Sequence, residues 1–167
     1  MGRGGLFLRK VRARVSDRPT GFLWVERGRV AASGYPASRR QLEWVKRQGV
    51  DTVLTLTEEP LPADLTSGIS MSFEHVPMND HAPPSLESLD EAATIVQGEV
   101  QRGRRVLVHC LAGQGRTMCA IAAYLIKVRA SDPDDAIAAL RSLRPGAVES
   151  GQERAVFDYA KSLRGEK

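Results

Sequence analysis

Apolar residues occur along this chain in two kinds of segment that follow one another in turn. Short runs rich in β-branched and aliphatic residues predict strands, and longer stretches with apolar residues three or four positions apart predict helices. The predicted strands are residues 29–32, 51–57, 73–77 and 105–109. The predicted helices are residues 38–48, 86–102, 116–129, 133–143 and 152–163.

Strands and helices that alternate in this way predict an α/β fold in a single domain. We expect a central, mostly parallel sheet of four to five strands, flanked by helices on both faces. Asp132 before Pro133 supports one helix start, because Asp caps free amide groups and proline fits the first turn. Sheets of this kind bind ligands beyond the carboxyl ends of their strands.

Length and composition agree with this architecture. A chain of 167 residues, 42% of them hydrophobic, can bury one core and leaves little room for a second domain. We assign residues 20–167 to that domain and residues 1–19 to a basic N-terminal arm. The two cysteines, one of them a candidate thiolate, favour a reducing compartment. No secretion signal, lipidation motif or apolar run of membrane-spanning length is visible, so we expect a cytoplasmic protein and a monomer.

The N-terminal arm carries much of the positive charge. Its first 18 positions hold six of the 24 basic residues and a single acid, Asp17, whereas the whole chain has a formal charge of +4. This charge could attract nucleic acid or an acidic membrane surface. No aromatic stacking platform accompanies it, so we favour an arm that is solvated or docks through Leu6, Phe7 and Val11. The basic residues are Arg3, Arg9, Lys10, Arg12, Arg14 and Arg18.

The most informative segment is the loop His-Cys-Leu-Ala-Gly-Gln-Gly-Arg-Thr at positions 109–117, between a predicted strand and a predicted helix. Gly113 and Gly115 allow backbone angles that turn successive amide groups inward into an anion-binding nest. The helix start adds unpaired N–H groups, and Arg116 can offer a planar fork to two phosphoryl oxygens. The same positive field favours the thiolate of Cys110, the form that attacks. The loop therefore predicts a phosphate site with its own nucleophile.

The residue types in this loop also have purely structural uses. A cysteine at a strand end is usually a small buried apolar residue, and glycine-rich turns between a strand and a helix are common in α/β proteins. A Walker-type nucleotide loop is not supported, because no Gly-Lys-Ser/Thr follows four spacer residues. A structural role alone does not account for His, Cys, Gly, Arg and a hydroxyl residue together at fixed spacing.

The loop resembles the signature of the cysteine-dependent protein tyrosine phosphatases, and its surroundings resemble the small atypical dual-specificity phosphatases. The resemblance extends over roughly residues 20–163. It includes residues 22–25 (Phe-Leu-Trp-Val), residues 54–58 (Leu-Thr-Leu-Thr-Glu), Asp80 with Pro83 and Pro84, and residues 143–149 (Leu-Arg-Pro-Gly-Ala-Val-Glu). The chain departs from the pattern at Met118, where many relatives have Gly. The resemblance implies a phosphatase fold around the predicted sheet.

The resemblance also implies a two-step, metal-independent hydrolysis of phosphate monoesters. Cys110 attacks the phosphorus, and Arg116 holds the phosphoryl group together with the backbone of the loop. That backbone belongs to Leu111, Ala112, Gly113, Gln114 and Gly115. Thr117 places a hydroxyl beside the sulfur, where it could stabilise the leaving thiolate or satisfy amide groups of the first helical turn. His109, at a buried strand end, is interpreted as a residue that organises the loop and tunes the thiolate.

A thiolate phosphatase needs a proton donor for the leaving oxygen. The resemblance assigns Asp80 as this acid, and then as the base for the water that cleaves the cysteinyl-phosphate. The residues alone leave the choice open, because Asp in a proline-marked loop is often a turn residue and His81 is a rival donor. Gln152 resembles a family residue that helps to position water, although a Gln at a helix start is more often simply exposed.

Metal catalysis is disfavoured, because the three histidines at 75, 81 and 109 lack the spacing of paired ligands. We expect no cofactor. Cys119 is expected in the core, with a regulatory disulfide to Cys110 as the alternative. The predicted substrates are phosphotyrosine and phosphoserine or phosphothreonine in proteins or peptides.

Three rival functions stay open at this point. Phosphoinositide phosphatases would use the same loop but often place lysines in it, and positions 111–115 contain none. An RNA 5′-phosphatase would suit the basic arm. A non-catalytic phosphate-binding module would normally lack Cys110, Arg116 or Asp80.

Overall fold

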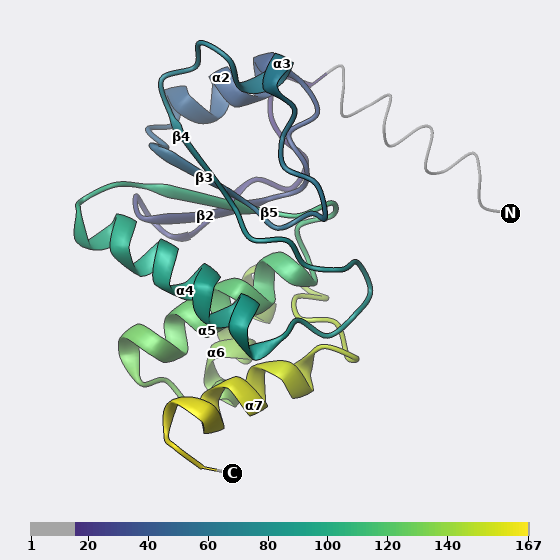
Figure 1. Ribbon diagram of the computed structural model, residues 1–167, viewed down its shortest axis with the longest axis vertical. Helices are drawn as coiled ribbons and strands as arrows, with labels where there is room; N and C mark the ends of the chain where they lie inside the picture. Colours follow the sequence, from purple (N-terminus) through teal and green to yellow (C-terminus); the bar gives the residue numbers. More distant parts are fainter. Residues whose placement is uncertain (1–15, 167) are drawn as a thin grey trace, which may run out of the picture.

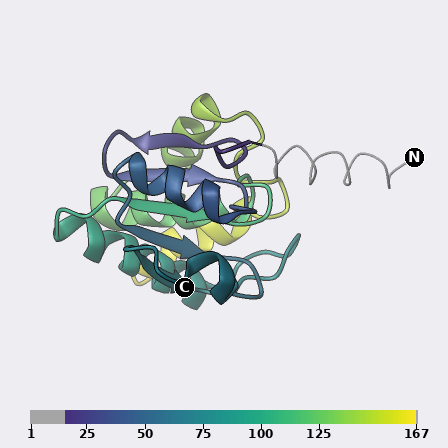
Figure 2. The same cartoon turned by 90° about the horizontal axis from the view of Figure 1, so that it is seen from above.

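The computed structural model describes residues 16–166 and contains a five-stranded sheet between two layers of helices (Figure 1). The strand order is β1-β2-β5-β3-β4, with β1 antiparallel to β2 and all other neighbours parallel. Figure 2 shows the arrow of β1 pointing opposite to that of β2. The strands are β1 (Leu23–Glu26), β2 (Val30–Ser33), β3 (Thr52–Thr55), β4 (Ser72–His75) and β5 (Val106–His109). The predicted mostly parallel α/β sheet is confirmed.

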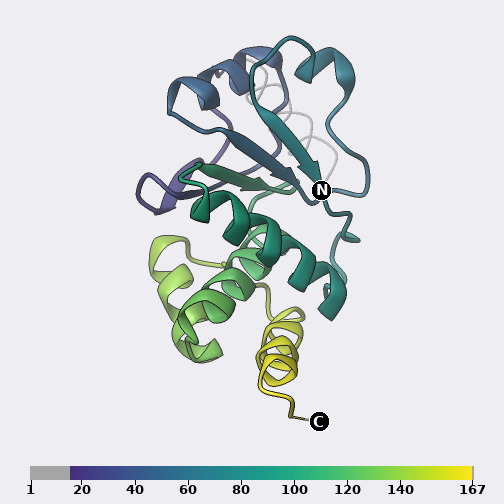
Figure 3. The ribbon, with the colours of Figure 1, turned by 60° about the vertical axis from the view of Figure 1, so that its left-hand side comes forward.

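Helices cover both faces of the sheet, as predicted. Helices α2 and α3 lie on one face, and α4, α5, α6 and α7 form the layer on the other (Figures 1 and 3). Two buried apolar clusters, one on each side of the sheet, hold these layers together. The helices are α2 (Arg39–Arg47), α3 (Ala63–Thr66), α4 (Leu86–Gln101), α5 (Arg116–Arg129), α6 (Pro133–Leu143) and α7 (Glu153–Leu163).

Helix α5 is the centre of the larger helical layer. It packs against α4, α6, α7 and β5, and its side chains are buried from Arg116 to Ile126. A helix that is apolar on all sides needs neighbours on all sides, and the alanines at 120, 122 and 123 let those neighbours approach. Met118, the departure from the family pattern, is fully buried in this core. The tight packing of α5 fixes the position of its N-terminus and of the loop before it.

Two elements were absent from the sequence prediction. Strand β1 pairs at the sheet edge, its four residues are all half-buried, and its register shifts between Trp24 and Glu26. Such a strand shows no clear alternation of apolar and polar residues, so the pattern gives no signal. Helix α3 has four residues, none buried, and no side-chain cap. The predicted strands and helices are present, with ends that differ by no more than two residues.

The parallel strands end at one level. Ser33 and Thr55, the last residues of β2 and β3, are both paired with His109, the last residue of β5. The loops that follow these strands therefore meet at one edge of the sheet, where α/β folds bind ligands. The loop at 110–115 lies in the middle of this edge because β5 is the central strand.

Of the predicted basic arm, residues 1–15 lie outside the described residues. The remainder contacts α2: Ser16 O accepts a hydrogen bond of 2.9 Å from Gln41 Nε2, and Asp17 forms an ion pair of 3.2 Å with Arg40. The Arg18 guanidinium lies 5.7 Å from the Trp44 ring. Within residues 16–166, no helix combines the length and apolar character needed to cross a bilayer.

Candidate active site

The loop after β5 wraps around the sulfur of Cys110. The Gly113 amide donates a hydrogen bond of 3.2 Å to Cys110 Sγ, and only 3% of Cys110 is exposed. Gly113 has a positive φ of 72°, a conformation that favours glycine. Gly115 is the N-cap of α5 and offers no side chain to the amide groups of the first turn. These groups and the helix dipole give the loop a positive potential that suits a phosphate dianion.

Both glycines of the loop lie close to other segments of the chain. A Cβ on Gly113 would lie 2.5 Å from the backbone of Ser33, and a Cβ on Gly115 would lie 2.6 Å from Gln152 Oε1. The loop is therefore pressed against the end of β2 on one side and against the start of α7 on the other. At Gly113 glycine is required for close approach to backbone as well as for conformation, whereas Gly115 has a negative φ and meets the end of a side chain.

His109 fixes the first peptide of the loop. Its Nδ1 lies 3.1 Å from the Cys110 carbonyl oxygen, so Nδ1 carries the proton, and Nε2 accepts a bond of 2.8 Å from Thr55 Oγ1. The ring is fully buried, and burial lowers the pKa of His109 from 6.5 to about 4. A neutral imidazole with both nitrogens engaged is suited to holding the loop backbone rather than to moving protons near neutral pH.

The depressed pKa of His109 predicts a pH-dependent stability. Between the unfolded value of about 6.5 and the folded value of about 4, the unfolded state binds more protons. Stability is therefore present above pH 6.5 and is lost as the pH falls through 4, by up to about 3 kcal/mol. Denaturant unfolding of the wild type and of His109→Asn between pH 4 and 7 measures this loss. The free energy of unfolding of the variant should fall less than that of the wild type over this range. An equal fall in both proteins would contradict the lowered pKa of His109.

Arg116 is buried among acceptors from two other loops. Its Nη1 donates to the Met78 carbonyl at 2.9 Å and forms an ion pair of 3.1 Å with Glu58 Oε2. Its Nη2 forms an ion pair of 3.1 Å with Asp80 Oδ1. Because a guanidinium is planar, acceptors at both ends fix the plane of the fork. The structure thus brings Arg116 and Asp80, which are 36 residues apart in the chain, into direct contact.

Glu58 is a site residue that the sequence reasoning missed as such. Its Oε1 accepts a bond of 2.8 Å from the Asp80 amide, while its Oε2 pairs with Arg116. Hydrogen bonds from its own backbone amide and from that of Asp80 hold the pKa of Glu58 below its ordinary value, and Arg116 adds to this. One carboxylate therefore joins the phosphate loop to the loop of the proposed acid. The available signal was its place in segment 54–58, immediately after a buried strand.

Asp80 and His81 lie side by side at the mouth of the site. Asp80 Oδ2 is 3.4 Å from His81 Nε2, and His81 Nδ1 is 3.9 Å from Glu149 Oε2. The His81 side chain is 80% exposed, whereas that of Asp80 is 36% exposed and contacts Arg116. The carboxylate is therefore the better held of the two candidate proton donors.

Thr117, Gln152 and Cys119 surround the loop from the helical side. The Thr117 hydroxyl is fully buried and has no hydrogen-bond partner in the described part of the chain. Gln152 is buried, contrary to the alternative of an exposed helical residue, and its Nε2 donates to the Ala82 carbonyl at 3.3 Å. Cys119 is a free thiol in the core, and burial raises its pKa to about 12.

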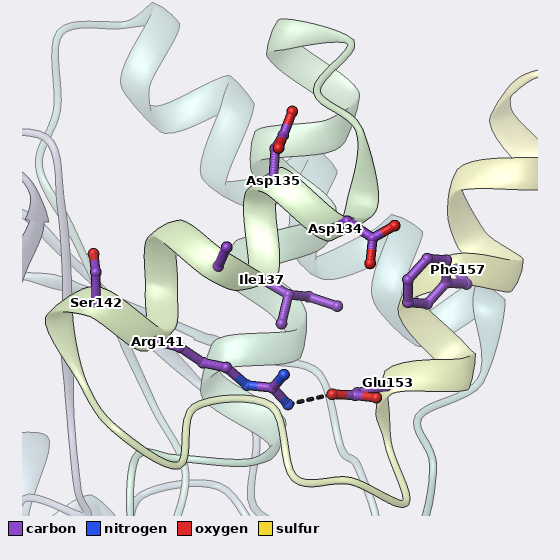
Figure 4. A pocket seen from close by; sticks show the side chains of 8 residues that line it. Asp134, Asp135, Ile137, Arg141, Ser142, Glu153 and Phe157 are labelled. Carbon is purple, nitrogen blue, oxygen red and sulfur yellow. Dashed lines mark hydrogen bonds and ion pairs between the residues drawn. The ribbon is translucent and has the colours of Figure 1, made fainter.

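A separate hollow of about 770 Å³ lies between α6 and α7. Figure 4 shows the carboxylates of Asp134 and Asp135, the ring of Phe157 and the ion pair of Arg141 with Glu153 around it. None of the predicted site residues lines this hollow. Among residues 16–166, no group of three or more His, Cys, Asp or Glu could hold a metal ion.

Known phosphatases resemble this chain over most of its length. The model of the DSP-PTPase phosphatase domain of Swiss Army Knife proteins (PTP-SAK) matches residues 19–157. The chain is 30% identical over 135 residues to the phosphatidylglycerophosphate phosphatase PTPMT1 of Arabidopsis thaliana. The aligned region covers 78% of this chain and 39% of that protein. It is 28% identical over 121 residues to the tyrosine-protein phosphatase CDC14 of Candida albicans. Here the aligned region covers 71% of this chain and 22% of that protein. The chain thus spans well under half the length of these two relatives.

Solved structures show the same fold. The crystal structure of Tk-PTP in its active form is 31% identical, with a TM-score of 0.75, over 84% of this chain and 96% of that chain. PTPMT1 in complex with PI(5)P is 21% identical, with a TM-score of 0.76, over 86% of this chain and 97% of that chain. The second likeness supports the fold alone. The chain therefore belongs to the dual-specificity branch of the cysteine-based protein tyrosine phosphatases, a family of phosphoric monoester hydrolases.

Proposed function

We propose that this chain hydrolyses phosphotyrosine, and phosphoserine and phosphothreonine, in proteins through a cysteinyl-phosphate intermediate, without a metal or other cofactor. The observation that carries the proposal is the assembly around one sulfur. Cys110 Sγ accepts the Gly113 amide just before the start of α5, and the fork of Arg116, the first residue of α5, is held by two carboxylates. Nucleophile, phosphate-binding groups and a proton donor are then within one site.

In the first step the Cys110 thiolate attacks phosphorus and the bond from phosphorus to the ester oxygen breaks. Arg116 and the inward amides of the loop bind the equatorial oxygens, whose charge they stabilise. Asp80, in its protonated form, gives its proton to the leaving oxygen. The products are the free alcohol or phenol, a phosphorylated Cys110 and the Asp80 carboxylate.

In the second step water replaces the sulfur on phosphorus. The Asp80 carboxylate takes a proton from the water, and Cys110 leaves as a thiolate. The unpartnered Thr117 hydroxyl is suited to donate a hydrogen bond to this sulfur, since a buried hydroxyl without a partner costs about 1–3 kcal/mol. Gln152, which touches the loops of Gly115 and Ala82, is the side chain that we assign to positioning the water.

The rim of the site favours a protein substrate. Leu111 is 53% exposed, Ala112 and Gln114 are also exposed, and no lysine stands between Cys110 and Arg116. The loop side of the rim is uncharged and partly apolar, and the exposed carboxylates of Asp80 and Glu149 lie near it. This rim suits a phosphorylated side chain on a peptide better than a headgroup with several phosphates. The CDC14 relative is named a tyrosine-protein phosphatase. We also propose that the protein is a monomer and acts in the cytoplasm.

A lipid phosphatase is the second candidate. Its support is the match to PTPMT1 of Arabidopsis thaliana, named a phosphatidylglycerophosphate phosphatase, over 78% of this chain. Both candidates use the same chemistry, so the difference lies in what surrounds the phosphate.

A substrate panel tests the proposal. We expect the full chain, in EDTA and reducing agent, to hydrolyse a chromogenic aryl phosphate and then phosphotyrosine, phosphoserine and phosphothreonine peptides with larger kcat/KM than vesicles containing phosphatidylglycerophosphate or phosphoinositides. A preference for the vesicles would contradict the proposal of protein substrates but would leave the cysteinyl-phosphate mechanism in place. Preference for RNA with a 5′-triphosphate, with activity that falls as salt rises, would indicate an RNA 5′-phosphatase. Phosphate binding with no turnover on any member would indicate a binding module.

A further inference from the structure

Arg144 reaches the phosphate loop from the C-terminal end of α6. Its Nη1 donates to the Gly113 carbonyl and its Nη2 to the Gly21 carbonyl, so one guanidinium joins segments 123 and 31 residues away in the chain. The side chain is half-buried. None of the catalytic steps proposed for Cys110, Arg116 and Asp80 uses it.

The bond to Gly113 bears on how the loop presents its amides. In a trans peptide the C=O and the N–H point in opposite directions, so a Gly113 carbonyl that faces Arg144 turns the Gln114 amide to the other side. The neighbouring peptides are held in the same way. Leu111 O accepts the Tyr35 amide at 3.0 Å, and Gln114 O accepts the Val148 amide at 3.2 Å.

Each of these carbonyl bonds comes from outside the loop. The Arg144 fork and the Val148 amide both belong to the turn between α6 and α7, so this turn holds two successive peptides of the loop. Arg141 braces the turn in its own place, since its guanidinium donates to the carbonyls of Ala147 and Val148 at 3.0 and 2.8 Å. The turn is thus a fixed support behind the anion-binding amides.

Arg144 also brings a positive charge toward the sulfur. Burial lowers the pKa of its guanidinium below the ordinary value, and the negative charge of Cys110 acts in the opposite direction. An arginine stays charged at any pH at which the enzyme works. Its charge therefore adds to the positive potential of the loop.

We infer that Arg144 is a positioning residue of the site, which holds the Gly113–Gln114 peptide in the orientation that binds phosphate and supports the Cys110 thiolate. This inference rests on the proposed function. The arginine touches neither substrate nor sulfur in this role. It acts through the backbone of the loop, which contacts both.

A lysine cannot replace this arginine. An ammonium group is a compact point charge, whereas the guanidinium spans two carbonyls with separate nitrogens. Gly21, with a φ of 64°, leaves space for the fork, because a Cβ there would lie 2.9 Å from Arg144 Nη2. The spacing of the Gly21 and Gly113 carbonyls and the missing side chain at Gly21 therefore fit a guanidinium group.

The test compares Arg144→Lys and Arg144→Met with wild type and with Arg154→Met. Arg154 is a matched control, because its side chain is 82% exposed on α7 and forms an ion pair with Asp158 four residues on. Three quantities are measured for each protein: the pH dependence of Cys110 alkylation by iodoacetamide, read by peptide mass spectrometry; the Kd for inorganic phosphate; and kcat and KM for an aryl phosphate. The melting temperature of each variant reports on folding.

We expect both Arg144 variants to bind phosphate about tenfold more weakly or worse, the scale for losing a charge-assisted hydrogen bond. The alkylation midpoint should move to higher pH, most in Arg144→Met, and kcat should fall. Arg154→Met should match wild type in all three.

Arg144→Lys that folds and keeps the wild-type alkylation profile and phosphate affinity would overturn the inference, as would a lowered melting temperature with these two readouts unchanged. If Arg144→Met does not fold, Arg144→Lys decides alone. Alkylation and phosphate binding need no turnover. An inactive wild type would therefore count against the proposed function and leave both readouts on Arg144 in force.

Discussion

Cys110→Ser is expected to abolish turnover, with kcat for an aryl phosphate falling on the order of 10⁴-fold or more. The neighbouring His109 cannot act as a general base for a serine hydroxyl at this position, because His109 Nδ1 is turned to the Cys110 carbonyl and Nε2 accepts from Thr55. The amides and the Arg116 fork are unchanged by the substitution. The measurement is the steady-state rate across pH 5 to 8 in EDTA and reducing agent.

The same variant should still bind phosphate. Replacing a thiolate by a neutral hydroxyl removes a negative charge next to the bound dianion, so the Kd for inorganic phosphate should be equal to or below that of wild type. Cys119→Ser is the control for loss of a thiol, since Cys119 is buried in the core and a serine hydroxyl can keep the bond that its thiol donates to Gln152 Oε1, so phosphatase activity should stay in place. Turnover by Cys110→Ser near the wild-type rate would remove Cys110 from the role of nucleophile.

Asp80→Asn is expected to slow hydrolysis by an amount that depends on the leaving group. Alkyl phosphates, whose alkoxides leave poorly, should lose about 10²- to 10⁴-fold in kcat/KM, the usual contribution of a general acid. Activated aryl phosphates need little protonation and should lose less than about tenfold. Asparagine keeps an oxygen that can accept from Arg116 and from the His81 amide, as Asp80 Oδ1 does. The loss then reports on the proton and not on the geometry.

A series of esters with leaving groups of different basicity measures this effect, with Asp158→Asn as the control. Asp158 is a half-exposed carboxylate on α7 that pairs with Arg154. An equal loss for all esters would show that another group donates the proton. His81 would then be examined first, because its Nε2 lies 3.4 Å from Asp80 Oδ2 at the mouth of the site.

Local segments of the sequence predicted most of the fold. The central strand and helix α5 were recognisable because a parallel strand and a fully buried helix are both continuous apolar runs around a distinctive loop. Strand β1 was missed because its residues are half-buried at an edge, and α3 because it buries nothing. The register that brings Ser33 and Thr55 level with His109 follows from sheet pairing and is not written in any one segment.

The sequence by itself determined the make-up of the loop and predicted its chemistry, because Cys110, the two glycines and Arg116 lie within seven consecutive residues whose spacing is fixed by covalent structure. Only the tertiary structure decided what holds that loop. Glu58, Asp80 and Arg144 come from three separate parts of the chain and reach it through strand ends and a helix turn. The positions of these three residues depend on how the sheet and the helical layers pack. The supporting residues therefore cannot be found from local pattern alone.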